Sequence, residues 1–202
     1  MENLRFRKAS TADLPRIAEI IRQAQAQMRA AGSDQWQNGY PAPADIARDI
    51  AAGTGYVLCL TPGGARGDGG EADVDMTAPG DGAACGGEVI AYGAASFDGE
   101  AAYEAIEQGR WLTEGPYVVL HRLAVADGAK RRGVAGRFMR QVEALARERG
   151  VGSFRVDTNF DNRYMLRLVE RRGFVYCGKV RYGSGERLAF EKVLDEASGC
   201  GR

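Results

Sequence analysis

Long apolar runs are missing from this sequence. No stretch approaches the roughly 20 apolar residues that a membrane-spanning helix needs, and the first ten residues carry no secretory pattern. An excess of one charge is missing too, since 27 Lys and Arg balance 27 Asp and Glu among 202 residues. We therefore expect a cytoplasmic protein with neither a membrane nor nucleic acid as partner.

Metal-ligating residues are few and scattered. His121 is the only histidine, and the cysteines Cys59, Cys85, Cys177 and Cys200 form no C-x-x-C pair. Zinc sites draw on clustered Cys and His at short spacings. We expect reduced thiols and no metal site.

What the sequence does have is an ordinary apolar share of 45%, arranged in alternating strand and helix patterns. Leu14, Ile17 and Ile21, for example, recur three and four apart, which is typical of one face of a helix. Ser10 and Asp13 precede them at the spacing of a capping box, which predicts a helix start there. The predicted strands cover 4–8, 55–60, 88–97, 117–125, 153–158 and a hairpin from 174 to 194, and the predicted helices cover 14 to about 32, 44–52, 133–149 and 162–172. This order predicts an α/β fold, a mixed central β-sheet with helices on both faces.

One stretch differs in composition from the rest. Residues 62–87 contain nine glycines, several acidic residues and almost no large apolar side chain. Such a composition does not compensate for the entropy lost on ordering. We predict one domain over 1–195 with a flexible insertion at 62–87, followed by a tail at 196–202.

The strongest chemical feature joins the strand 117–125 to the helix that follows. Basic residues precede small ones at the helix start, where the first N–H groups and the helix dipole favour an anion. Small side chains also let a phosphate approach the backbone. The candidate anion-binding residues are Lys130, Arg131, Arg132, Gly133, Val134, Ala135 and Gly136.

Their spacing resembles the signature of the GNAT N-acetyltransferases. In that family Gln or Arg, two residues, Gly, one residue, and Gly or Ala form the loop that binds the pyrophosphate of coenzyme A. Here Lys130 stands first, which is a departure, and Gly133 and Ala135 take the small positions. A second block resembles the family at 162–174, where an Asn opens a helix and Gly-Phe begins the next strand.

The resemblance covers residues 117–174 and implies a single-domain GNAT-like fold with acetyl-CoA as co-substrate. It implies that the strand before the loop offers backbone groups to pantetheine and that the second helix contributes an Asn contact. Outside the loop, the implied cofactor residues are Leu123, Ala124, Val125, Asn162 and Met165. An N-cap role alone would also explain Asn162.

The resemblance also implies direct attack of a primary amine, on a small molecule or a peptide, in a ternary complex with the thioester. The base is predicted to be His121, because histidine ionises near neutral pH and this one lies on the strand beside the expected thioester. The alternative base is Glu114, acting through water.

The residue that protonates the departing thiolate stays open. Many family members have a tyrosine where this chain has Val169. Tyr164, Tyr176, Cys177 and water are the candidates. The missing tyrosine leaves room for a different class of protein, a catalytically inactive acyl-CoA-binding regulatory module. A structural protein whose basic loop binds any phosphate or RNA is a third reading, and it would need a broad basic surface.

Three aromatic residues in loops are predicted to shape the acceptor site: Trp36, Tyr40 and Trp111. Glutamates near Trp111 would attract a cationic amine, namely Glu100, Glu104, Glu107 and Glu114. The acceptor itself and the oligomeric state, a homodimer included, are not fixed by the sequence.

Overall fold

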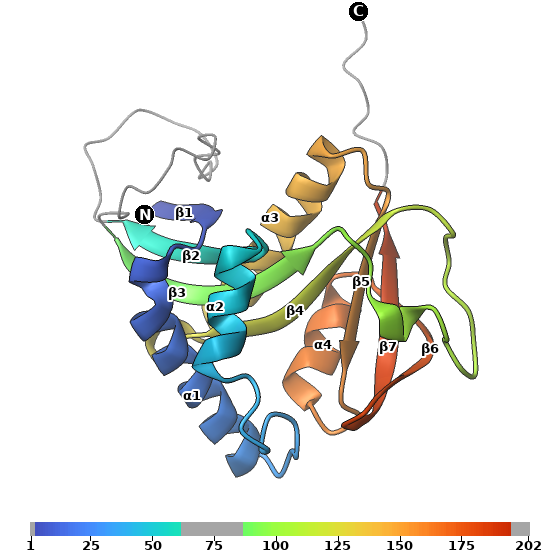
Figure 1. Ribbon diagram of the computed structural model, residues 1–202, viewed down its shortest axis with the longest axis horizontal. Helices are drawn as coiled ribbons and strands as arrows, with labels where there is room; N and C mark the ends of the chain where they lie inside the picture. The colour runs from blue at the N-terminus through green and yellow to red at the C-terminus, as the bar shows by residue number, and fades with distance from the viewer. Residues whose placement is uncertain (1–2, 62–86, 195–202) are drawn as a thin grey trace, which may run out of the picture.

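The computed structural model describes residues 3–61 and 87–194. Its seven-stranded sheet has the order β1-β2-β3-β4-β5-β7-β6 (Figure 1). The strands are β1 (Asn3–Lys8), β2 (Gly55–Thr61), β3 (Glu88–Ser96), β4 (Tyr117–Val125), β5 (Ser153–Thr158), β6 (Val175–Tyr182) and β7 (Gly185–Val193). The helices are α1 (Leu14–Ala30), α2 (Pro43–Ala51), α3 (Val134–Glu148) and α4 (Arg163–Arg171). The predicted α/β fold with a mixed sheet is confirmed, since β4 and β5 pair in parallel and the other neighbours antiparallel.

Parts of the predicted domain plan lie outside the described residues. Residues 62–86 of the predicted insertion and the tail at 196–202 are among them. So are Cys85 and Cys200, whereas Cys59 and Cys177 are described and buried.

Helices cover both faces of the sheet, as predicted: α1 and α2 lie on one face, and α3 and α4 on the other (Figure 1). Neighbouring residues of β3 show this, because side chains alternate between the faces of a strand. Tyr92 reaches Asp49 of α2 with its hydroxyl, and the next residue, Gly93, faces Phe138 of α3. An ion pair between Arg172, at the end of α4, and Glu143 of α3 ties the two helices of the second face together.

The predicted capping box before α1 is present. The Asp13 carboxylate accepts hydrogen bonds from the Ser10 backbone N–H at 2.7 Å and from its hydroxyl at 2.9 Å. Arg7, on β1, donates to the same carboxylate from two guanidinium nitrogens. The start of α1 is therefore fixed to the edge of the sheet.

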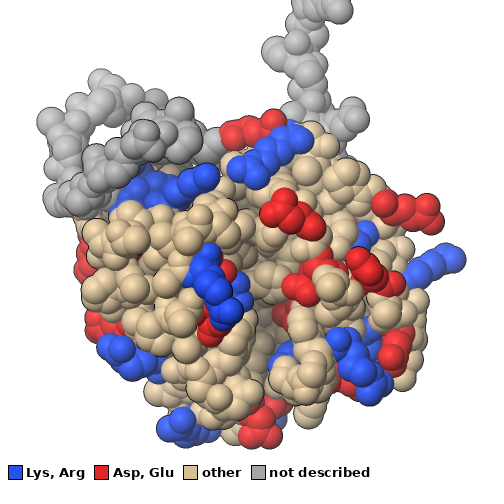
Figure 2. Space-filling view, viewed as in Figure 1, with Lys and Arg blue, Asp and Glu red and all other residues tan. Residues whose placement is uncertain are grey.

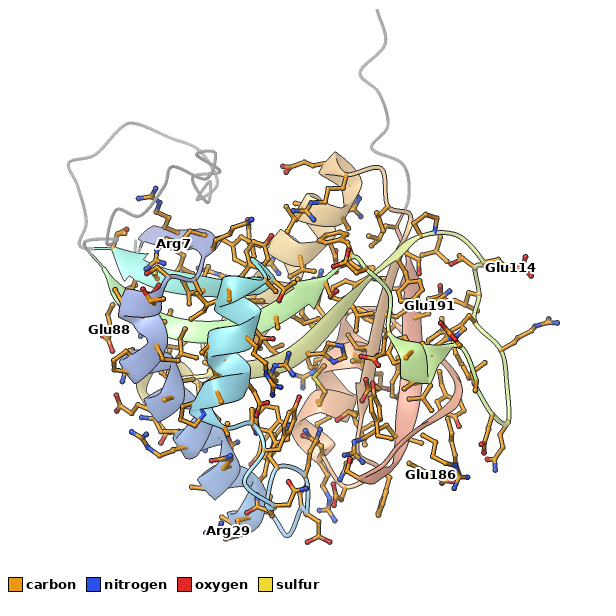
Figure 3. All side chains as sticks on the ribbon, in the orientation of Figure 1. Arg7, Arg29, Glu88, Glu114, Glu186 and Glu191 are labelled. Carbon is orange, nitrogen blue, oxygen red and sulfur yellow. The ribbon has the colours of Figure 1, made fainter. Side chains whose placement is uncertain are left out.

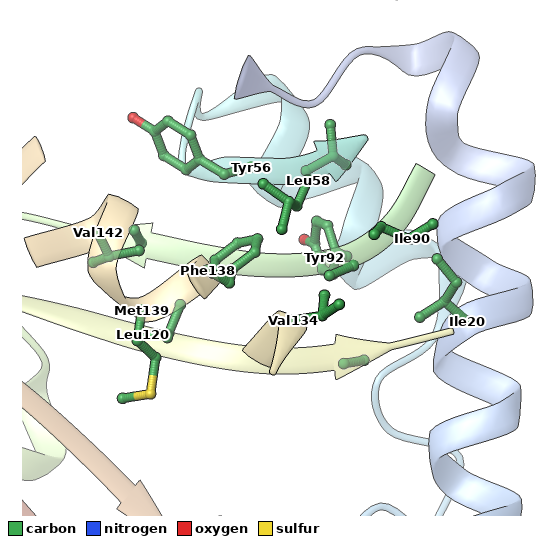
Figure 4. Close-up of a cluster of buried hydrophobic side chains, with 14 of the residues drawn as sticks. Ile20, Tyr56, Leu58, Ile90, Tyr92, Leu120, Val134, Phe138, Met139 and Val142 are labelled. Atoms are coloured by element: carbon green, nitrogen blue, oxygen red, sulfur yellow. The ribbon is translucent and has the colours of Figure 1, made fainter. Parts of the chain in front are cut away.

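Buried apolar side chains fill the core between β3, β4 and α3 (Figure 4). Phe138 of α3 is completely buried and meets Phe6 edge to face at 5.2 Å between ring centroids. A Cβ atom on Gly93 would lie 2.9 Å from Cε1 of Phe138 and 3.0 Å from Cδ1 of Leu120. Glycine is therefore needed there for space.

Gly93→Ala is expected to lower the free energy of unfolding by about 1–3 kcal/mol, the usual cost of overpacking a filled core. Urea denaturation measures it. The matched control is Gly152→Ala, because a Cβ there meets nothing within 4 Å and should change stability by less than about 0.5 kcal/mol. Equal stability of the two variants would contradict the packing described here.

The connection between β3 and β4 packs over the far end of the sheet, where it forms a second small core. Tyr103 and Val119 are buried there, and Trp111 and Tyr117 pack against them. The Arg155 guanidinium lies 4.3 Å from the Trp111 ring centroid and 3.9 Å from that of Tyr117. This connection thereby brings its first residues, including Glu100, over β4.

Candidate functional site

The site is a cleft that opens where two parallel strands part. β4 and β5 pair only over Tyr117–Val119 and Ser153–Arg155. Beyond Val119 the two strands no longer pair. The backbone groups on that side of the following β4 residues therefore do not pair with β5. A cleft of about 580 Å³ occupies this opening.

Five segments line the cleft: the end of α1 with the loop after it, the β3–β4 connection, the middle of β4, the β5–α4 junction and the β6–β7 hairpin. Acidic and basic side chains are interspersed on the face shown in Figure 2, without a large area of one sign. The lining residues are Met28, Asp34, Gln35, Trp36, Asn38, Tyr40, Glu100, Leu120, His121, Arg122, Leu123, Asp157, Thr158, Asn159, Asn162, Met165, Tyr182, Gly183, Ser184 and Arg187.

His121, the predicted base, lines the cleft and is paired with a carboxylate. Its Nε2 lies 3.1 Å from Oε2 of Glu100. The hydrogen bond from His121 lowers the pKa of Glu100, which keeps this carboxylate ionised and therefore an acceptor only. The proton of neutral His121 is thus held on Nε2, and Nδ1 is left with a lone pair.

The next residue, Arg122, forms a bulge in β4. It has a φ of +57°, and the register with β3 shifts at this point. A left-handed backbone costs a residue with a side chain roughly 1–2 kcal/mol. Asp49 of α2 holds the side chain in place, with Oδ2 2.8 Å from Nε and Oδ1 2.5 Å from Nη2. Tyr92 donates to the same carboxylate at 2.5 Å.

Two of the predicted acceptor residues, Trp36 and Tyr40, do line the cleft. The Tyr40 hydroxyl contacts Nη1 of Arg122. Burial raises the pKa of Tyr40, in spite of the nearby guanidinium. The loop after α1 is therefore joined to the bulge of β4 through one arginine.

A third carboxylate, that of Asp157 on β5, faces the cleft between two tyrosines. Its Oδ1 accepts the Tyr103 hydroxyl at 2.8 Å and the Tyr182 hydroxyl at 3.0 Å. Burial, together with the adjacent Asp157 charge, raises the pKa of both tyrosines. The two hydroxyls stay protonated at neutral pH and act as donors to Asp157.

Leu123, Asn162 and Met165 of the predicted cofactor set line the cleft. Asn162 is also the N-cap of α4, because its Oδ1 accepts the Met165 backbone N–H at 3.1 Å. Its Nδ2 donates to Oε1 of Gln35 at 2.8 Å. The capping role and the place at the cleft are therefore both present in one side chain.

Further along β4 the chain leads from the cleft to the start of α3. Ala124 and Val125 pair with β3 and are followed by the predicted phosphate-binding loop. Gly133, the N-cap of α3, has a φ of +74°, a conformation that glycine adopts without a Cβ penalty. A hollow of about 340 Å³ lies at this helix start, lined by Leu4, Arg16, Leu60, Glu88, Ile90, Ala126, Gly128, Ala129, Arg132, Val134 and Arg137.

The basic residues of this loop differ in their surroundings. Lys130 is paired with Asp127, with Nζ 2.5 Å from Oδ1, so its charge is largely neutralised locally. Arg131 and Arg132 are exposed. The helix start, the open space over Gly133 and Gly128 and these arginines fit a diphosphate group.

Three of the predicted site residues lie away from the cleft. Glu114 is exposed at the outer edge of the β3–β4 connection (Figure 3). The Cys177 thiol is buried and donates to the backbone oxygen of Val175 at 3.4 Å. Trp111 packs in the second core, and its Nε1–H donates to the backbone oxygen of Tyr103 at 2.9 Å. All three lie outside the residues that line the cleft.

The other candidates for the acid are also away from the cleft. Tyr164 is 60% exposed and Tyr176 is 48% exposed, and neither lines the cleft. Val169 is completely buried in the core. Among the predicted glutamates, Glu100 alone reaches the cleft, whereas Glu107 pairs with Arg181 at 3.1 Å on the surface.

The sequence prediction missed the residues Asp49, Arg122, Asp157 and Arg187. A signal existed for Arg122, since two polar residues in succession at His121 and Arg122 break the alternation of a strand and are typical of a bulge. No comparable signal marks the others, because their partners are distant in sequence.

Neither a metal-binding cluster nor a membrane-spanning helix is found within the described ranges 3–61 and 87–194. No group of three or more His, Cys, Asp and Glu side chains could hold a metal ion there. No helix in these ranges combines the length and the apolar character needed to cross a membrane.

A family profile and a solved structure both relate this chain to one protein family. The profile of the acetyltransferase (GNAT) family matches residues 71–174. A GNAT-family acetyltransferase structure from Streptococcus agalactiae is 30% identical, with a TM-score of 0.75, over 95% of this chain and 96% of that one. No curated protein sequence matches.

More distant structures share the fold. A putative acetyltransferase from Staphylococcus aureus is 20% identical over 94% of this chain and 99% of that one, with a TM-score of 0.60. The PaiA N-acetyltransferase from Thermoplasma acidophilum, in complex with coenzyme A, is 13% identical over 95% and 99%, with a TM-score of 0.63. With the family profile matching over half of the sequence and a 30% identical relative aligned along nearly its whole length, this chain belongs to the GNAT acetyltransferase family.

Proposed function

We propose that this protein transfers the acetyl group of acetyl-CoA to a primary amine in a ternary complex, with His121 as the base. The observation that carries the proposal is the place of His121, on the strand edge exposed by the parting of β4 and β5. Membership of the acetyltransferase family supports the acyl transfer, and the complex of the PaiA enzyme with coenzyme A supports the co-substrate.

The residues at the cleft fit this co-substrate. Backbone groups of β4 at Leu123 lie along the open edge, and the chain continues from there to the start of α3, where helix N–H groups favour a diphosphate. Asn162 and Met165 line the opposite wall. When bound, acetyl-CoA supplies an activated acyl group.

His121 then acts as the general base toward the acceptor nitrogen. The Glu100 carboxylate holds Nε2–H, so Nδ1 accepts the proton that a bound ammonium loses to become the attacking amine. The ionised Glu100 also stabilises the imidazolium that results. The carbon–sulfur bond breaks as the nitrogen–carbon bond forms, and the nitrogen gives up its second proton to solvent. The released thiolate takes a proton from solvent or from this imidazolium.

Asp157 provides a second interaction for the acceptor. One of its oxygens accepts the two tyrosine hydroxyls. Asp157 lines the cleft together with Asp34 and Glu100. These charges favour an ammonium over a neutral alcohol as the incoming group, and this supports an amine as acceptor.

The first experiment is thermal unfolding with acetyl-CoA, followed by thiol release with a panel of amines. Acetyl-CoA at about 100 times its dissociation constant should stabilise the fold by roughly 2.7 kcal/mol. Gly133→Val forces a branched side chain into a left-handed backbone in the predicted phosphate-binding loop. This variant should therefore lose most of the stabilisation by acetyl-CoA. Absence of stabilisation in the wild type would overturn the proposal.

Thiol release decides between transfer and binding alone. Release that requires an amine and yields its acetamide supports the transferase. Stabilisation without release on any amine would instead favour the catalytically inactive acyl-CoA-binding module.

A further inference from the structure

One cation in the cleft has no anionic partner among the described residues. Arg187, on β7, is partly buried and lines the cleft. Its Nη1 donates to the backbone oxygen of Glu186 and its Nη2 to the hydroxyl of Ser184, each at 3.1 Å. Within the part of the chain that the structure describes, no carboxylate pairs with its guanidinium. A partly desolvated charge of this kind favours an anion from outside.

Two arginines near Arg187 do have carboxylate partners. The other arginine of the cleft, Arg122, is neutralised by Asp49. Arg181, on the same hairpin as Arg187, is 60% exposed and pairs with both Glu107 and Glu186. Of the two arginines that line the cleft, Arg187 is therefore the one whose described partners are all uncharged.

The β6–β7 hairpin positions this side chain. Tyr182, Gly183 and Ser184 form its tip and line the cleft together with Arg187. The guanidinium carbon of Arg187 lies 6.0 Å from the centroid of the Tyr182 ring, and the Tyr182 hydroxyl donates to Asp157. Tyr182 thus contacts a cation with its ring and an anion with its hydroxyl.

We propose that Arg187 binds a carboxylate of the acceptor, so that the acceptor is an amino acid rather than a simple amine or a polyamine. The inference rests on the proposed function, and it names the substrate class of the same site. The ammonium of the acceptor lies at the His121, Glu100 and Asp157 side of the cleft, and its carboxylate pairs with Arg187. One cleft then provides groups of both signs for a zwitterion.

The chemistry of the guanidinium suits this role. Its planar N–H groups match the two oxygens of a carboxylate, and the contacts to Ser184 and Glu186 leave N–H groups over for such a pair. A polyamine would place a second cation against Arg187, which like-charge repulsion disfavours.

The test uses amino acids, each compared with its primary amide, which replaces the carboxylate with a neutral group of nearly the same shape. Wild-type protein is assayed for kcat/KM by thiol release, and for binding by thermal unfolding in the presence of coenzyme A. The amide makes the neighbouring amine less basic, so more of it is unprotonated near neutral pH. A preference for the acid therefore does not arise from amine reactivity.

We expect kcat/KM for the best amino acid to exceed that for its amide by about 10- to 100-fold. This is the factor that a hydrogen bond between charged groups typically contributes to binding. Arg187→Ala should remove this preference and leave kcat/KM for the amide within about threefold. Arg187→Lys should retain part of this preference, because the positive charge remains. It should not retain all of it, because lysine lacks the planar N–H groups that match the two oxygens of a carboxylate. Arg181→Ala is the matched control on the same hairpin and should behave as the wild type.

The outcomes separate this inference from the proposed function. Equal rates and equal binding for acid and amide, or an equal loss for both in Arg187→Ala, would overturn the carboxylate site while leaving the transferase intact. A preference for diamines would overturn it as well. Binding that discriminates acid from amide through Arg187, without any thiol release, would support the carboxylate site and contradict the proposed transfer.

Discussion

His121→Ala is expected to lower kcat by about 10²- to 10⁴-fold, which is the usual contribution of a general base. The dissociation constant of acetyl-CoA should stay within a few-fold of the wild type. The reason is that the side chain contacts Glu100 and the cleft, whereas the features that fit the diphosphate lie at the start of α3. Steady-state kinetics and calorimetric titration of acetyl-CoA measure the two quantities on the same sample.

Two controls sharpen this prediction. Glu100→Gln keeps a hydrogen-bond acceptor for Nε2–H but loses the charge, and it should show an intermediate loss of kcat. Glu114→Gln should leave kcat unchanged, because Glu114 is exposed and lies outside the cleft lining. An unchanged kcat in His121→Ala would remove His121 from the mechanism.

Asp49→Ala should lower the free energy of unfolding by about 3–5 kcal/mol, the cost of removing one partner of a buried ion pair. Asp49 is 7% exposed and holds both Arg122 and the Tyr92 hydroxyl. Its loss leaves a desolvated guanidinium on a residue whose left-handed backbone is already unfavourable. Urea or guanidinium denaturation at neutral pH measures the effect.

The matched control lies on the same helix. Arg48→Ala removes an ion pair with Asp45 in which the arginine side chain is 76% exposed, and it should cost less than about 1 kcal/mol. Asp49→Asn should fall between the two, since it retains hydrogen bonds without the charge. A loss in Asp49→Ala no greater than in Arg48→Ala would show that the bulge of β4 does not depend on this pair.

The sequence determined the order of the elements because the signals for them are local. Apolar residues three and four apart marked α1 and α3, and the capping box of Ser10 and Asp13 marked a helix start that the structure confirms. The candidate phosphate-binding loop could also be located in the sequence, because a strand, small residues and a helix start are adjacent in the chain. His121 could be singled out as a candidate because it is the only histidine.

Tertiary structure alone decided the partners of these residues. Glu100 reaches His121 from the connection before β4, and Asp49 reaches Arg122 from α2, 73 positions away in the sequence. Asp157 and Arg187 meet at Tyr182 because β7 lies between β5 and β6, a strand order that the periodicity of a sequence does not encode. That Trp111, Glu114 and Cys177 lie away from the cleft was not visible in the sequence for the same reason: residue type indicates what a side chain can do, and packing decides where it points. Local spacing thus determined the fold class and the position of the candidate cofactor loop, whereas long-range burial and ion pairing determined which polar side chains meet at the cleft.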